Sequence, residues 1–454
     1  MAKLNRNQKS LLIVQMIRMI LELFTSTFLT SHIISLDPEN IFGSGLFNVA
    51  ILFISQYIAY IVVYTINSYF VDKSNRTNFL RVGIFVNACF LVAIVLWGEI
   101  IAHWIVLAGA ICGISNAFYY SSFNVMKNEL VNRIYMKKFS ILNTVFTNLI
   151  NVIFPTLLGL LIDVSSYSTI SIYVIIIIAI QFIISFFIKS PKPTGSKLEV
   201  RKYLKYLKDT PEDRNKIKYT YFNGLLAGIK TTYKIVIIIL TIFAFKTNLS
   251  LGILSSVFSI ITIALLMLYR KSEDNPKTNK LLIYLTVGTL PLISCILFMF
   301  WTNKATFIIL NCFLTIAIYF SDYYGDAERD AIIKNLGKFE FIAEHNLIHD
   351  AMKYTVSIFV YLLFILVASF ESITAFKILL ISMIAICPFK FYMMYKQRLV
   401  RKKFEQELKA QKAEERAAAK AAAETTAEAE TESQKVIENE TVEVELKLQK
   451  NRKK

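Results

Sequence analysis

The chain has 454 residues, of which 55% are hydrophobic and 18% are charged, and its formal net charge at pH 7 is +17. The mean hydropathy of +0.51 excludes an ordinary soluble globular protein. The basic residues are spread over many short segments rather than along one face, which argues against a nucleic-acid-binding protein.

Long apolar runs follow one another along the chain. Each has about the 20 residues that a helix needs to cross a hydrocarbon core of roughly 30 Å. The first run is expected to be a retained helix, because the segment MAKLNRNQKS lacks a small-residue cleavage site. The fold class is therefore an all-α polytopic membrane protein. We predict twelve transmembrane helices, at residues 11–31, 46–68, 79–97, 102–126, 139–163, 168–188, 219–245, 249–269, 281–300, 305–324, 342–370 and 373–395.

The connections between the spans predict the orientation of the chain. The connection 69–81 contains three basic residues and 127–138 contains four, whereas 32–45 contains none. Because short basic connections face the cytoplasm, both termini are expected there. The abundance of Ile, Lys and Asn is typical of an AT-rich bacterial genome. We therefore expect a multi-pass protein of a bacterial plasma membrane.

A polar segment at residues 189–218 separates the first six predicted spans from the last six. This division predicts two six-helix bundles, at 1–188 and 219–395, joined by a basic cytoplasmic linker. Residues about 200 positions apart match at corresponding helix ends, as Tyr119 and Tyr319 do. The matches favour a duplicated six-helix unit.

Two further segments lie outside the predicted bundles. Within the linker, residues 198–208 have the pattern of a short amphipathic helix, which we expect to lie on the anionic membrane leaflet. The segment 396–454 is predicted to be a cytoplasmic tail. Its first part has high helix propensity, and from about Thr425 its acidic, Thr-rich and Glu-rich composition predicts disorder.

The first span carries two ionisable residues at a depth where charge is costly. Measured from Leu11, Arg18 and Glu22 lie about 10 and 16 Å along the helix. Their i, i+4 spacing allows them to pair. A self-neutralising pair could serve helix packing alone, but ionisable groups within a span are a functional hypothesis by default. We therefore place both residues in a substrate cavity and consider Glu22 for proton coupling.

The segment after the second span carries a recognisable motif, Ser68-Tyr-Phe-Val-Asp-Lys-Ser-Asn-Arg-Thr77. It resembles the loop 2–3 signature of the major facilitator superfamily, Gly-x-x-x-Asp-Arg/Lys-x-Gly-Arg-Arg/Lys. Asp72, Lys73 and Arg76 match, whereas Ser68 and an asparagine stand at the two glycine positions and Thr77 replaces the last basic residue. The resemblance covers about residues 10–396.

The resemblance implies a fold and a mechanism. The fold is two pseudo-symmetric six-helix bundles, and the mechanism is transport by alternating access. The motif residues Asp72, Lys73 and Arg76 are implied to form a gate at the cytoplasmic ends of the helices. Glu273 stands in a more degenerate counterpart in the second half. Positive-inside anchoring alone would explain Lys73 and Arg76, but not Asp72.

Polar residues in the fourth and seventh spans extend the predicted cavity. The fourth span contains Asn116 and Tyr119, and the seventh contains Lys230 and Lys234, again spaced i, i+4. Two lysines one turn apart repel, so they need compensation by Glu22 across the bundle interface, by loss of lysine charge or by an anionic substrate. The charged residues of the first and seventh spans sum to +2, which favours an anionic or zwitterionic organic solute.

Charged residues also gather near the cytoplasmic ends of the tenth and eleventh spans. Asp322 and Asp326 follow the tenth apolar run, and His349, Asp350 and Lys353 share one face early in the eleventh. We assign all five to the cytoplasmic gate, with His349 and Asp350 exchanging partners with the two aspartates, and consider Asp322 for proton coupling. A polar interfacial cap on a membrane helix is the alternative reading of the eleventh span.

Two other classes of protein, a membrane metalloenzyme and a non-transporting receptor or scaffold, fit the sequence less well than a transporter. A membrane metalloenzyme could use His345 and His349, but the chain has only four histidines and lacks the His-Glu-x-x-His order of zinc proteases. A non-transporting receptor or scaffold would gain nothing from charges at mid-depth. We therefore predict no enzyme activity, no metal and no cofactor.

The sequence thus predicts a secondary active transporter of a small organic solute, coupled to protons or another ion. No Gly-x-x-x-x-Gly-Lys-Ser/Thr sequence is present, so ATP is not expected to drive it directly. A lipid or lipid-linked precursor flippase and a drug efflux pump are the alternatives on the same fold. The expected partners are the solute, the coupling ion and membrane lipids, and we expect a monomer.

Overall fold

The computed structural model describes residues 5–71, 75–131, 133–190, 199–273, 278–336 and 341–404, and short stretches of the tail up to residue 419. The spans belong to one compact unit, Met1–Gln397, and the residues from Arg398 onward form a second. The described residues of this second unit are helical, and the part of the tail predicted to be disordered lies outside the described residues.

Helices make up both halves of the main unit. The N-terminal half contains α1 (Arg6–Leu23), η1 (Phe24–Phe28), α2 (Leu29–Ser35), η2 (Ile41–Gly45), α3 (Leu46–Val71), α4 (Arg76–Trp97), η3 (Gly98–Trp104), α5 (Ile105–Leu130), α6 (Arg133–Val164) and α7 (Tyr167–Ser185). The C-terminal half contains α9 (Pro211–Phe245), α10 (Asn248–Glu273), α11 (Lys280–Phe300), α12 (Lys304–Asn335), α13 (Ile342–Ala368) and α14 (Ile373–Ile384). Between them lies α8 (Val200–Asp209).

The described residues contain eleven stretches that are long and apolar enough to span a membrane. One of them, Arg76–Lys127, has 52 residues, which is too long for a single span. Gly98 interrupts it with a φ of +49°, a conformation that favours glycine. The helices α4 and α5 then pack side by side, with the Ser115 hydroxyl donating to the Gly83 carbonyl at 2.9 Å. The stretch is therefore two spans, and the prediction of twelve transmembrane helices is confirmed.

The first span is not a uniform α-helix. It begins at a capping box, in which the Asn5 side chain accepts from the Gln8 backbone N–H at 2.8 Å and the Gln8 side chain accepts from the Asn5 N–H at 3.0 Å. Directly after Glu22 and Leu23 the chain widens into the π-helical turn η1, and α2 completes the span. Wide turns of this kind are rare and often occur at functional sites.

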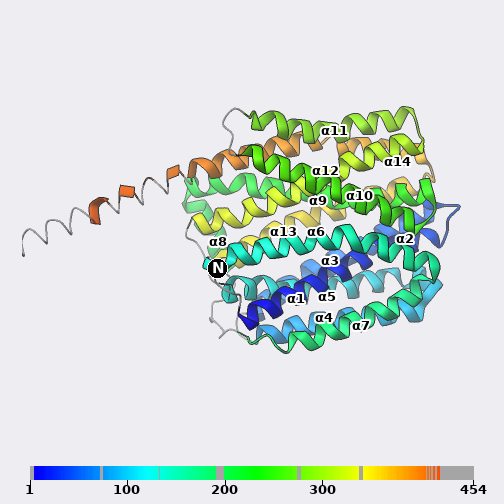
Figure 1. Ribbon diagram of the computed structural model, residues 1–454, viewed down its shortest axis with the longest axis horizontal. Coiled ribbons are helices and arrows are strands. Elements are labelled where there is room, and N and C mark those ends of the chain that lie inside the picture. The colour runs from blue at the N-terminus through cyan, green and yellow to red at the C-terminus, as the bar shows by residue number, and fades with distance from the viewer. Residues whose placement is uncertain are drawn as a thin grey trace, which may run out of the picture. The chain divides into compact units, whose positions relative to one another are not determined.

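The most extensive contacts between the two halves are those of α3 with α13 and of α6 with α10, and α2 also packs on α9. Figure 1 shows the N-terminus and α8 at one end of the bundle, which we call the inner end, and α2 at the other, the outer end. Aromatic rings fill the α3–α13 contact. The Phe53 ring stacks on Tyr361 at 5.3 Å, and Tyr57 and Tyr60 each lie 4.7 Å from Tyr354.

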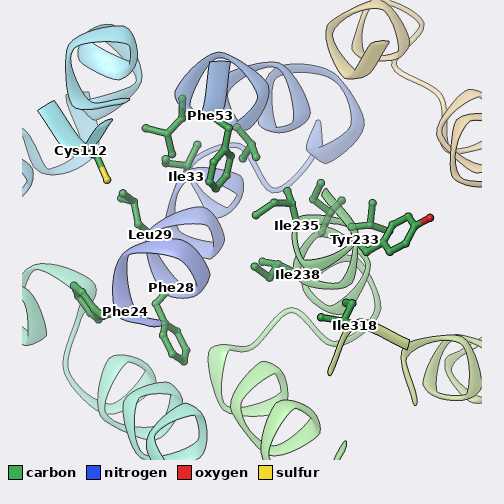
Figure 2. Close-up of a cluster of buried hydrophobic side chains, with 14 of the residues drawn as sticks. Phe24, Phe28, Leu29, Ile33, Phe53, Cys112, Tyr233, Ile235, Ile238 and Ile318 are labelled. Atoms are coloured by element: carbon green, nitrogen blue, oxygen red, sulfur yellow. The ribbon is translucent and has the colours of Figure 1, made fainter. Parts of the chain in front are cut away.

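Polar contacts also join the halves at the outer end. The Asp163 carboxylate at the end of α6 accepts from the backbone N–H groups of Asn248 and Leu249, at 3.1 and 2.8 Å, where α10 begins. The Ser31 hydroxyl donates to the Asn248 side chain at 2.6 Å. Beneath these contacts the interface is apolar, and Figure 2 shows Ile235 and Ile238 of α9 pointing toward the helices of the N-terminal half.

The linker contains the helix expected there, at Val200–Asp209 instead of 198–208. Tyr203 and Leu207 are covered by protein, whereas Leu204 is 51% exposed. Tyr203 packs on Phe341 and its hydroxyl lies 3.1 Å from Nδ1 of His345. This face of α8 therefore lies against α9 and α13, and the position of the helix on the membrane leaflet stays a prediction.

Candidate functional site

The N-terminal half holds a charged cluster between α1 and α5. Arg18, only 2% exposed, donates from Nε to Glu22 at 3.2 Å and from a terminal nitrogen to the Asn116 side chain. The Tyr120 hydroxyl donates to the same Glu22 oxygen at 2.5 Å. Asn116 and Tyr120 are one turn apart, so α5 presents both to the same side of α1. The predicted pairing of Arg18 and Glu22 is thus present, and α5 completes it.

The Arg18 guanidinium is fixed by more than its charge. Its plane lies over the Tyr119 ring, 4.9 Å from the centroid, and the Tyr119 hydroxyl donates to the Gln15 side chain at 3.0 Å. Such a contact suits a planar guanidinium better than an ammonium. One terminal nitrogen, Nη1, is buried and has no hydrogen-bond partner among the described residues. The cluster therefore contains one N–H donor group, Nη1 of Arg18, that could donate to a ligand.

A second charged cluster lies in the C-terminal half, on α9 and α12. Lys230 forms an ion pair with Asp322. The charges of Lys230, Lys234 and a third lysine, Lys390, all act on the Asp322 carboxylate. Three compensators were considered for the lysine pair, and Glu22 is not the one observed, because it pairs with Arg18 within its own half. Asp322 compensates Lys230 instead.

In both clusters the basic side chain is mostly covered and the acidic side chain is partly exposed. The side chains of the cations are covered, at 2% exposure for Arg18 and 12% for Lys230. The carboxylates beside them are accessible, at 35% for Glu22 and 34% for Asp322. In each cluster the carboxylate is thus more accessible than the cation with which it pairs.

The predicted gate at the inner end is described only in part. Arg76 is fully buried at the first position of α4, following the Asn75 cap. Asp72 and Lys73 lie outside the described residues. Glu273 ends α10, and Asp326 lies in α12, but their side chains are outside the described part of the chain.

The polar face of the eleventh span lies near α3 and α9. Nδ1 of His349 lies 3.4 Å from Asp350, and Asp350 accepts from the Tyr60 hydroxyl of α3 at 3.5 Å. The Lys353 ammonium lies over the Tyr354 ring at 4.8 Å. In this structure Asp322 pairs with Lys230, and the exchange of partners expected between this face and the tenth span stays a prediction.

Comparison with known proteins identifies the family. The sequence profile of the family described as Major Facilitator Superfamily matches residues 11–323. The chain belongs to that superfamily. The transporter therefore has the twelve-helix fold that its motif implied, and it is not an enzyme.

Solved structures share the fold of this transporter at low sequence identity. A bacterial homologue of the iron transporter ferroportin, in an inward-facing state, is 12% identical, with a TM-score of 0.62 over 87% of this chain and 99% of that one. A mutant of the nucleoside transporter NupG is 12% identical, with a TM-score of 0.54 over 86% of this chain and 100% of that one. Comparison with curated proteins gives no match.

The histidine pair of the transporter is divided between two environments. His345 Nδ1 lies 3.1 and 3.0 Å from the hydroxyls of Tyr203 and Tyr221. His349 instead faces Asp350 and lies close against Gly224 of α9. Within the described part of the chain, no group of three or more His, Cys, Asp and Glu residues could hold a metal ion.

Sequence reasoning missed two residues of the transporter. Lys390 lies within the last predicted span and was not singled out. A lysine at the eighteenth position of a 23-residue apolar run could have indicated a functional residue. Asp163 was treated as the end of a span, and nothing in the local pattern indicates that it contacts α10. Lys390 belongs to the charged cluster of the C-terminal half, and Asp163 to the contact between the halves.

Proposed function

We propose that this protein is a secondary active transporter that moves a small anionic or zwitterionic organic solute across a plasma membrane by alternating access. The observation that carries the proposal is the charge of the two clusters. Arg18 and Glu22 cancel. Lys230, Lys234 and Lys390 share one carboxylate, Asp322, so this cluster has more basic side chains than acidic ones.

Charge of this kind is unfavourable within a membrane unless something compensates it. Arg18 has a buried donor without a partner among the described residues, and so does Lys390. An anionic group of the solute would supply the missing acceptors. The zwitterion-like pair of the N-terminal half would receive the rest of the solute.

The accessible carboxylates support coupling to protons. Asp322 forms an ion pair with one close cation, Lys230. If the solute takes Lys230, the carboxylate loses that cation and binds a proton more readily. Glu22 accepts hydrogen bonds from both Arg18 and Tyr120. Asp322 is the stronger candidate for proton coupling because Lys230 is its one close ion-pair partner among the described residues.

The test is uptake into proteoliposomes with an imposed pH gradient, using a panel of organic anions, amino acids and cationic drugs. We expect uptake of an anion or a zwitterion that responds to the gradient. Arg18→Lys and Lys230→Gln should abolish it without loss of expression. Arg81→Lys is the matched control, because Arg81 lies over the Phe186 ring away from both clusters.

Other outcomes would replace the proposal. Efflux of a cationic drug alone would indicate a drug pump, and movement of labelled phospholipid between leaflets would indicate a flippase. Normal uptake by Lys230→Gln would remove the charge argument.

A further inference from the structure

The last span breaks in the middle of the C-terminal half. The helix α14 ends at Ile384, a turn follows, and the helix resumes at Cys387. Pro388 explains the break, because it has no N–H to donate to the carbonyl of Ile384. A Cβ added to Gly288 of α11 would lie 2.9 Å from the Pro388 Cα, so the neighbouring helix packs tightly on the break.

A side chain from α9 secures this break. The Tyr233 hydroxyl donates to the Met383 carbonyl at 2.8 Å, and the Cys387 thiol lies 3.6 Å from the same hydroxyl. Figure 2 shows Tyr233 pointing away from Ile235 and Ile238, which face the N-terminal half. The residues that follow the break are therefore tied to α9, the helix that carries Lys230 and Lys234.

Lys390 comes directly after the break and is buried, at 4% exposure. Its charge acts on Asp322 and on Lys230. Its ammonium nitrogen is buried without a hydrogen-bond partner among the described residues. Lys230 already occupies Asp322, so Lys390 is an ammonium near a carboxylate that another lysine has taken.

Lys377 shows that burial of a lysine in this span does not itself require a ligand. It is also buried, at 9% exposure, but its ammonium donates to the Thr302 hydroxyl and lies over the Phe298 ring at 5.3 Å. Lys377 thus has a hydrogen-bond acceptor for its ammonium group, whereas Lys390 has none among the described residues. The missing acceptor is therefore at the charged cluster of the C-terminal half.

Lys234 is the second lysine of the cluster without a close partner. It is exposed, and it forms no ion pair with the described residues. Lys390 is fixed by the break and Lys234 is accessible, and both act on the same carboxylate. One doubly charged anionic group could therefore satisfy both.

We propose that Lys390 and Lys234 bind a doubly negative group of the solute, a phosphate or a pair of carboxylates. The inference rests on the proposed function, because it requires an anionic solute to enter between the halves. The inference adds that Lys390 determines the preference of the site for doubly over singly negative solutes.

The test measures binding to the purified full-length protein at constant ionic strength, with inorganic phosphate, succinate, acetate and choline as probes. We expect phosphate and succinate to bind, acetate to bind at least about tenfold more weakly, and choline not to bind. In Lys390→Gln the preference for succinate over acetate should fall to about twofold or less, whereas Lys390→Arg and Lys377→Gln should keep it.

The ratio of two affinities does not depend on the fraction of protein that is folded, so a poorly folding variant still gives an answer. If the wild type takes up anions but Lys390→Gln keeps the full preference for succinate over acetate, the inference about Lys390 is wrong and the proposed function still holds. Binding and uptake of cations only would overturn the proposed function and the inference with it. Phospholipid vesicles containing or lacking a phosphomonoester headgroup distinguish a lipid phosphate from a free one.

Discussion

Lys230 of α9 and Asp322 of α12 form an ion pair that joins two helices of the C-terminal half beside two further lysines. Removing the Asp322 carboxylate leaves Lys230, Lys234 and Lys390 without the negative charge that they share. We expect Asp322→Asn to lower transport at least about tenfold. A charge-assisted hydrogen bond contributes roughly 1.5–3 kcal/mol, and about 1.4 kcal/mol corresponds to a factor of ten.

The matched experiment is the charge reversal Lys230→Asp with Asp322→Lys, measured by uptake into vesicles beside each single variant. If the pair acts as a pair, the double variant should recover part of the activity that both single variants lose. Equal activity of the double variant and the worse single variant would show that the two residues act separately.

The contact of Asp163 with the start of α10 predicts an effect on the outer end. Asp163→Ala removes the acceptor of two backbone N–H groups, those of Asn248 and Leu249. Loss of a helix cap costs about 1 kcal/mol, which would lower the ratio of closed to open protein at the outer end by about fivefold.

Cross-linking of Ser31→Cys with Asn248→Cys, in a background without the native cysteines, reports this closure. The two side chains are in contact in the present structure. The yield of cross-link should fall when Asp163→Ala is added. An unchanged yield would mean that the apolar contacts beneath close the outer end alone.

Gly228 predicts a limit on side-chain size between α9 and α13. A Cβ at this position would lie 2.3 Å from the Lys353 carbonyl oxygen and 2.7 Å from the Val356 Cβ. Because the first of these is backbone, the helices would have to separate, and we expect Gly228→Ala to cost about 1–3 kcal/mol. The thermal midpoint of the purified protein should fall. Gly45→Ala is the control, because its nearest atom would be at 3.6 Å, and an equal fall in both variants would contradict the prediction.

The docking of α8 should depend on alkaline pH. Burial raises the pKa of Tyr203 from its ordinary value of 10 to about 12. The neutral hydroxyl is therefore favoured when α8 is docked. Its contribution is constant below pH 10 and is lost as the pH rises toward about 12.

Amide hydrogen exchange of α8 checks this dependence between about pH 9 and pH 11, after correction for intrinsic exchange. Protection should fall over that range in the wild type and fall less in Tyr203→Phe, which has no titrating hydroxyl. Identical loss of protection in both proteins would assign the effect to another tyrosine.

The fold could be predicted from the sequence because each span is specified locally. A run of apolar residues of the right length predicts a helix across the membrane without knowledge of its neighbours. The pairing of Arg18 with Glu22 was predictable for the same reason, because both are on one helix, one turn apart.

The partners of Lys230 and Lys390 could not be predicted in this way. Asp322 is 92 residues from Lys230, and only the packing of α9 on α12 brings them together. The depth of Asp322 along its own helix favoured a gate at the inner end. Helix α12 continues to Asn335, well beyond the predicted end of the span at 324, although its apolar stretch ends at Asp322.

The wide turn η1 changes the direction in which the first span presents its side chains. An inserted residue rotates everything after it by about 100° relative to an uninterrupted helix. Before the turn, Arg18 and Glu22 face α5 of their own half, and after it α2 packs on α9 of the other half. The first span thus contacts α5 through charged side chains before the turn and α9 through α2 after it. The rotation at η1, and not only the residue types, places the charged residues and the apolar residues of this span against different neighbours.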